Sequence, residues 1–142
     1  DNIIENQTSI TNDESADYPL SNALNWNLYD VWKPSVSGVS NVDFTLAAPD
    51  SVNYFAMYGH NLSGVTVNIK RYGLGWIDVA SFVVGSNNTV FEVFNELSDN
   101  RWLIQFDGLT ISSQITCMPL GSAVQLNPLR TPFAPPPLLP QR

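Results

Sequence analysis

Few residues of this 142-residue chain could carry out acid–base or nucleophilic chemistry, and they stand apart in the sequence. His60 is the only histidine. In the segment YGHNLSG it could act as a base, bind a ligand or stabilise a turn, and its turn-forming neighbours favour the last. Ser63 lies nearby, but the sequence has no G-x-S-x-G motif. Cys117, the only cysteine, falls in an apolar segment, which predicts a buried, unreactive thiol. We therefore expect that the chain is not an enzyme.

The carboxylates form no recognisable catalytic or metal-binding pattern. Glu92, Glu96 and Asp99 are the nearest group. A pair among them could serve glycoside hydrolysis, which needs two carboxylates at a set distance, but a solvated strand end and turn is the simpler interpretation. A metal site would have to combine His60 with carboxylates that lack metal-ligand spacing. We expect neither a metal nor a cofactor.

Aromatic residues offer a different chemistry, the binding of a sugar. Trp26 stands between two asparagines in a polar segment, and Tyr29 follows it closely. An exposed tryptophan beside amides can stack on the apolar face of a sugar while the amides bind its hydroxyls. Packing beneath the loop, or against a neighbouring subunit, is the alternative. The predicted glycan contacts are Trp26, Tyr29, His60 and Asn61.

The elements that must position these residues are β-strands. Apolar and polar residues alternate in several segments, as in Val42, Phe44 and Leu46, and such alternation indicates a strand with one buried face. The segment 52–58 is apolar on both faces, which predicts a central strand. Only 21–24 suggests a short helical turn. The predicted strands cover 42–47, 52–58, 65–70, 76–84, 90–94, 101–106 and 111–118.

Turn residues separate these strands about every ten positions, notably Pro49-Asp50 and Ser98 to Asn100. This spacing predicts an all-β antiparallel sandwich. Trp32 is expected in the core, and Trp76 in the core or half-buried. The other predicted core residues are Phe44, Leu46, Tyr54, Ala56, Val65, Val67, Ile69, Trp102, Ile104, Phe106 and Ile115.

Composition narrows the range of partners. Thirteen acidic residues against six basic ones give a net charge of −7, which disfavours nucleic acid as a partner. No apolar run is long enough for a membrane span. The proline-rich segment 127–142 cannot join a sheet interior and predicts an extended arm after a domain at 1–126. Its predicted docking residues are Leu129, Phe133, Pro135, Pro136, Pro137, Leu138 and Leu139.

Several segments, in order, resemble the discoidin (coagulation factor 5/8 type C) family. The run YPLSNAL at 18–24 is similar to the opening motif of that family, RWLIQF at 101–106 to one of its strands, and SQITCMPLG at 113–121 to its closing strand. The resemblance implies a jelly-roll sandwich of galactose-binding-like type. Asn25-Trp26 departs from the usual Asp-Gly, in a loop that often helps to hold calcium or ligand.

A narrower resemblance joins YPLSNAL, GHNL and the terminal LNPLRTPFAPPPLL to virion proteins of tailed bacteriophages. It implies a non-enzymatic tail or baseplate subunit located in the virion, whose arm docks on other virion proteins and on copies of itself. The alternatives are a module that binds a glycan of the host cell surface, and a capsid decoration protein.

Overall fold

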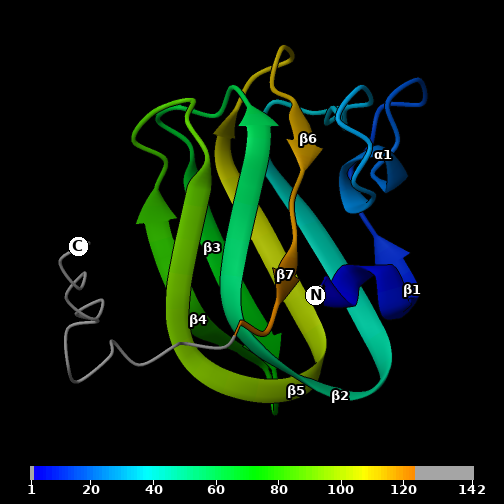
Figure 1. The fold of residues 1–142 in the computed structure, drawn as a ribbon, viewed down its shortest axis with the longest axis vertical. Helices are drawn as coiled ribbons and strands as arrows, with labels where there is room; N and C mark the ends of the chain where they lie inside the picture. Colours follow the sequence, from blue (N-terminus) through cyan, green and yellow to red (C-terminus); the bar gives the residue numbers. More distant parts are fainter. Residues whose placement is uncertain (1, 124–142) are drawn as a thin grey trace, which may run out of the picture.

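The computed structural model of the chain describes residues 2–123, so the boundary predicted at residue 126 and the arm at 127–142 lie outside the described residues. Strands dominate this part (Figure 1), and within it no helix has the length and hydrophobicity of a membrane span. The elements are η1 (Ile3–Asn6), β1 (Gln7–Thr11), α1 (Ser21–Leu24), β2 (Gly38–His60), β3 (Thr66–Tyr72), β4 (Trp76–Val83), β5 (Val90–Leu109), β6 (Ile115–Cys117) and β7 (Leu120–Gly121).

Two long antiparallel strands, β2 and β5, run through both layers of the sandwich. Their halves 38–45 and 101–109 pair in the first sheet, and 50–57 and 90–99 pair in the second. Both strands curve over together between these halves, at the lower end of Figure 1. The first sheet is completed in the order β1-β2-β5-β3-β4, and β6 and β7 pair with β2 in the second. The predicted antiparallel jelly-roll sandwich is thereby confirmed.

The turns predicted at Pro49-Asp50 and Ser98 to Asn100 are wrong, because the strands bend there without ending. The pairing shifts register across the bend, from Thr45 opposite Arg101 to Asp50 opposite Asp99, so both strands continue through it with a bulge in β2. Asp99 also stabilises the corner: its side chain binds Arg71 at 2.8 Å and its carbonyl accepts the Trp102 indole N–H at 3.0 Å.

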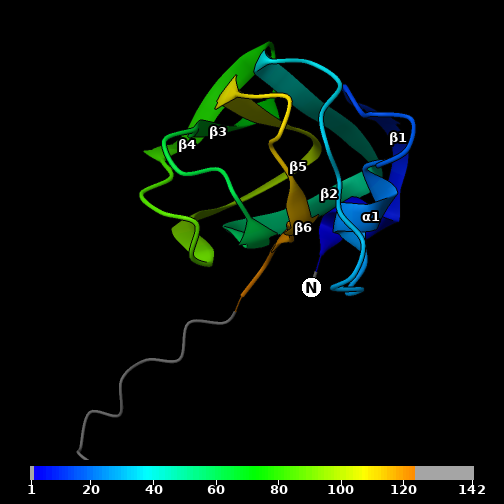
Figure 2. The ribbon, with the colours of Figure 1, turned by 90° about the horizontal axis from the view of Figure 1, so that it is seen from above.

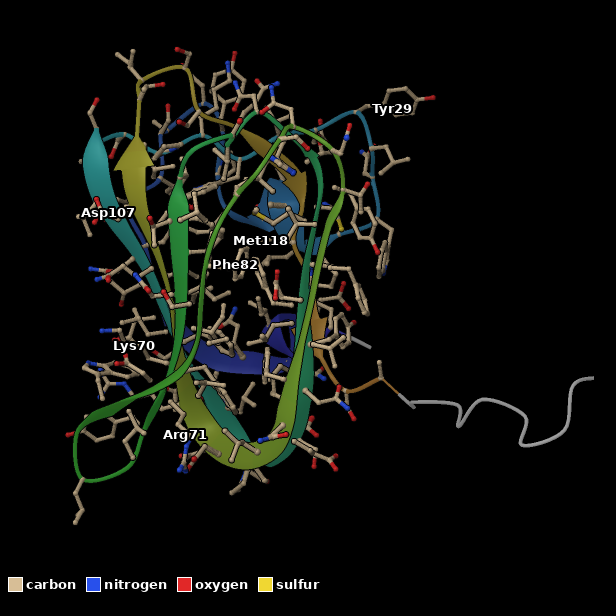
Figure 3. The ribbon with its side chains drawn as sticks, turned by 90° about the vertical axis from the view of Figure 1, so that its left-hand side faces the viewer. Tyr29, Lys70, Arg71, Phe82, Asp107 and Met118 are labelled. Atoms are coloured by element: carbon tan, nitrogen blue, oxygen red, sulfur yellow. The ribbon has the colours of Figure 1, made fainter. Side chains whose placement is uncertain are left out.

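The core lies between the two sheets, and every residue predicted for it is buried. Trp32 packs against Phe106 with ring centroids 5.7 Å apart. Figure 3 shows Phe82 and Met118 between the layers, and Lys70 on the outer side of the first sheet. The prediction that Trp76 is in the core or half-buried is wrong: its side chain is 38% exposed, and its ring lies against Arg101 and Tyr72. Ile3 and Ile4 join the core from an N-terminal segment for which the sequence pattern predicts no element.

The segment from α1 to Trp32 is anchored at the end of the sandwich beside β6, as Figure 2 shows from above. Trp32 and Ile115 exchange two backbone hydrogen bonds of 2.8 and 3.0 Å, and Met118 donates to the Ala23 carbonyl at 3.0 Å. These bonds hold both ends of the intervening loop, so its residues project at the end of the sandwich.

Candidate functional site

The loop at 25–30 is shaped by its own asparagine side chains. The side-chain Oδ1 of Asn25 accepts the backbone N–H of Asn27 at 2.8 Å, and the side-chain Oδ1 of Asn27 accepts the backbone N–H of Tyr29 at 3.0 Å. The Asn27 amide also donates to Asp30 at 2.8 Å, and the Asn25 amide to the Ser21 carbonyl at 3.2 Å. Side chains that bind the backbone two residues on form successive Asx turns, which give the loop a defined shape without burying it.

This shape leaves the apolar side chains of the loop in solvent. Trp26 is 61% exposed, Leu28 67% and Tyr29 95%. In Figure 3 the Tyr29 ring points away from the body of the molecule. The Trp26 ring faces Tyr58 from β2, with centroids 6.4 Å apart and planes at 50°. Large exposed apolar side chains held in a fixed arrangement are typical of binding surfaces.

Between the loop and the sheet lies a depression of about 370 Å³, here called the aromatic cleft, lined by Trp26, Leu28, Tyr58, Gly59 and Thr116. Gly59 adds no side chain to this lining. The Thr116 hydroxyl donates to the Gly59 carbonyl at 2.8 Å. Gly59 has φ +59°, and a Cβ there would lie 2.5 Å from the Thr116 hydroxyl oxygen. Only glycine fits this close approach, so Gly59 allows Thr116 of β6 to pack directly against β2 at the cleft.

Two of the four predicted glycan contacts lie on this loop, and two serve the turn behind it. His60 is 5% exposed; its Nδ1 accepts the Leu62 N–H at 3.2 Å, and its Nε2 lies 2.6 Å from the Asn88 carbonyl, which assigns the proton to Nε2. Asn61 donates to the Ser112 carbonyl and accepts the Gln114 N–H, both at 2.8 Å. The polar atoms of both side chains are thus engaged in holding loops, and neither residue lines the aromatic cleft.

The other residues considered for chemistry lie apart from the cleft or are buried. Cys117 is 1% exposed, and burial, followed by the charge of Glu5, raises the pKa of its thiol. Asp99 is held by Arg71 in the corner of the sandwich. Within residues 2–123, no three His, Cys, Asp or Glu side chains gather where they could hold a metal ion.

Leu28 and Tyr58 line the cleft but are not among the residues predicted from the sequence. Tyr58 lies 32 positions after Trp26, at the end of a strand pattern that indicates burial, so nothing local marks it as a binding residue. Leu28, between Trp26 and Tyr29 in a polar segment, could have been found by the same reasoning that singled out its neighbours.

Solved structures with this fold include modules of other proteins. The CBM32-1 and CBM32-2 domains of Clostridium perfringens ZmpB match with a TM-score of 0.68 and 13% identity, over 83% of this chain and 35% of theirs. They are also known in complex with GalNAc. Chitosan-binding module 1 from a chitosanase/glucanase of Paenibacillus sp. IK-5 matches with a TM-score of 0.65 and 13% identity, over 86% of this chain and 99% of that one.

The CBM32 domain of AlyQ, solved with 4,5-unsaturated mannuronic acid, matches with a TM-score of 0.59 and 18% identity, over 82% of this chain and 96% of that one. This chain spans about a third of the ZmpB structures. At these identities the likeness establishes the fold, a jelly-roll β-sandwich, and nothing finer. No protein-family model matches the sequence, and a search of curated proteins finds no match. Nothing in the comparisons indicates a phage origin.

Proposed function

We propose that this chain is a carbohydrate-binding module that holds a sugar against Trp26 in the aromatic cleft. The observation that carries the proposal is a tryptophan 61% exposed on a loop preorganised by Asn25 and Asn27. The fold supports it, because the similar structures include a GalNAc complex, a chitosan-binding module and a mannuronic acid complex. This is the alternative given by the sequence, and it now has more support than the virion role.

The cleft suits the apolar face of a pyranose ring. Covering about 100 Å² of the exposed indole and the adjoining leucine would stabilise a complex by about 2.5 kcal/mol. The hydroxyls on the opposite edge of the sugar would face the rim, where Asp30 is exposed beside Asn27. Because the loop is already ordered by its own hydrogen bonds, little conformational entropy is lost on binding.

Charge favours a sugar without a carboxylate. Each lysine or arginine among residues 2–123 already contacts a carboxylate or an aromatic ring, while the chain carries a net charge of −7. A uronic acid would therefore find no unengaged cation in this part of the chain. The contacts are Lys33 over the Tyr18 ring at 4.1 Å, Lys70–Asp78 at 3.5 Å, Arg71–Asp99 at 2.8 Å and Arg101–Asp43 at 2.8 Å.

The test is binding to a panel of neutral, amino and uronic oligosaccharides, followed by calorimetric titration of the best ligand. Trp26→Ala should weaken binding about 30-fold, which corresponds to the loss of about 2 kcal/mol of stacking. Leu74→Ala, which removes a fully exposed side chain outside the cleft, should leave affinity unchanged. Equal affinity of the wild type and Trp26→Ala for every ligand would refute the site.

The virion role remains a separate proposal. It rests on the proline-rich arm at 127–142 and on the resemblance of that segment to phage virion proteins. It predicts association through the arm, in a particle where many copies of a weak glycan site would act together.

A further inference from the structure

The outer face of the first sheet carries an ordered set of polar side chains. Asn41, Gln105, Asn68 and Ser81 stand side by side on β2, β5, β3 and β4. Hydrogen bonds link them in a chain: Gln105 to Asn41 at 3.0 Å, Asn68 to Gln105 at 3.4 Å and Ser81 to Asn68 at 2.6 Å. This amide row crosses four strands, so its members are held in fixed positions.

Beside the amide row, the Arg101 side chain is held by a carboxylate and by two aromatic rings. It donates two hydrogen bonds to the Asp43 carboxylate, of 3.1 and 2.8 Å. Its guanidinium also lies 4.8 Å from the Tyr72 ring centroid and 4.9 Å from that of Trp76, and these two rings meet edge to face at 5.2 Å. Because β3 separates β4 from β5, the contact with Arg101 shows that Trp76 reaches across the face of the sheet.

Trp76 forms one wall of a depression of about 300 Å³, here called the face groove. The last residue of β1 and the two residues after it, 11–13, also line it. Leu103 points outward between Asp43 and Lys70 in the register, yet it is only 7% exposed, since neighbouring side chains close around it. The complete lining is Thr11, Asn12, Asp13, Asn41, Asp43, Trp76 and Leu103.

The two carboxylates of the face groove are held in fixed positions by hydrogen bonds. One oxygen of Asp13 accepts the Ser40 hydroxyl at 3.2 Å and the Asn41 N–H at 3.4 Å. Asp43 is held by Arg101 and, as a carboxylate, can accept further hydrogen bonds. Two carboxylates against one guanidinium give the groove a net negative charge. An indole, an apolar floor and oriented acceptors together suit a pyranose that carries a positive charge.

We propose that the face groove is a second sugar-binding site, selective for amino sugars, with the ammonium group held between Asp13 and Asp43 and the ring against Trp76. The sugar class rests on the proposed function, whereas the site itself uses none of the residues of the aromatic cleft. A polysaccharide that contains amino sugars would then contact the module on two separate surfaces. Occupation of both sites would raise the overall affinity for that polysaccharide.

The probe is a glucosamine hexamer, with its fully N-acetylated form as the neutral control, titrated at low salt into the full chain and variants. The background is Trp26→Ala, so that only the face groove is measured. Binding of the glucosamine hexamer should persist in that background and weaken about fivefold in the added variant Asp13→Asn, which removes one ionic contact but keeps an acceptor. Asp107→Asn, a change of an exposed carboxylate on the same face outside the groove, should have no effect.

Trp76→Ala provides a second readout, with thermal melts to verify folding. It should abolish the remaining binding, and the N-acetylated hexamer should bind at least tenfold more weakly than the amino form. The inference is overturned if the glucosamine hexamer fails to bind the Trp26→Ala background, if the Asp13 and Asp107 variants behave alike, or if both hexamers bind equally. The proposed function fails separately, if Trp26→Ala changes no affinity in the otherwise unaltered chain.

Discussion

Replacing Gly59 by alanine tests whether the lining of the aromatic cleft requires a glycine. The residue has φ +59°, and the added Cβ would lie 2.5 Å from the hydroxyl oxygen of Thr116 and 2.8 Å from its Cβ. Both features oppose alanine: the first strains the backbone, and the second forces β6 away from β2. A shift of Thr116 would also lengthen its 2.8 Å hydrogen bond to the Gly59 carbonyl.

These effects set the size of the expected loss. A left-handed conformation costs a non-glycine residue about 1–2 kcal/mol. Overpacking at a tight contact costs roughly 1–3 kcal/mol, and a weakened hydrogen bond about 1 kcal/mol. Because relaxation at one place relieves the others, we expect about 3 kcal/mol in total, a large part of the ~5–15 kcal/mol stability of a typical domain.

Alanine variants at two other glycines measure the backbone strain separately from the contact with Thr116. Gly64 has φ +88°, and a methyl group added there would meet no atom within 4 Å, so Gly64→Ala should cost only the strain, about 1–2 kcal/mol. Gly85 has an ordinary φ and open space, so Gly85→Ala should be neutral or stabilise by less than about 1 kcal/mol. The loss in free energy of unfolding should therefore be largest for Gly59→Ala, smaller for Gly64→Ala and smallest for Gly85→Ala.

The assay is urea unfolding followed by tryptophan fluorescence. With a slope of about 2 kcal/mol per molar urea, Gly59→Ala should lower the midpoint by about 1.5 M and Gly64→Ala by less than about 1 M. Equal losses for these two variants would show that the approach of Thr116 is not what requires glycine, and would refute the account of the cleft lining.

Two further predictions concern alkaline pH and the arm. Burial is the first cause that raises the pKa of Cys117 and of Tyr54 above their ordinary values of 9.0 and 10.0. The native state then binds more protons than the unfolded chain at high pH, so stability should hold below about pH 8 and fall above it. Cys117→Ala should reduce this decline in urea midpoints, and a midpoint unchanged up to about pH 10 would contradict it. The arm should cause association: sedimentation of the full chain should show oligomers, and a chain ending at Leu126 should be monomeric. Two monomers would argue against the virion assembly role.

Much of the fold can be predicted, because the alternation of apolar and polar residues indicates which face of a strand is buried. Phe44 and Leu46 are buried where Asp43 and Thr45 are partly exposed, and the doubly apolar segment after Val52 is buried on both faces. The short helical turn predicted at 21–24 is present as α1. In these segments the local pattern and the tertiary environment agree.

Strand ends and edges are harder to predict. Pro49-Asp50 and Ser98 to Asn100 have turn composition, but each faces the other across a paired ladder, and that pairing is invisible to either segment alone. Strand β1 escapes prediction because QTSIT has little apolar alternation; it is an edge strand, specified by pairing with β2. Glu92 likewise takes its position from pairing with Phe55 of the neighbouring strand and not from its spacing to other carboxylates.

The candidate sites divide in the same way. By itself, the sequence determined that the chain is acidic and poor in catalytic groups. The order of its residues determined strands in which apolar and polar residues alternate, and a tryptophan in an asparagine-rich segment. Only the tertiary structure decided that His60 and Asn61 hold loops, that Tyr58 faces Trp26, and that Trp76 crosses the sheet to Arg101. The reason is physical: burial follows from local periodicity, whereas a binding surface is made by side chains whose proximity depends on long-range strand pairing.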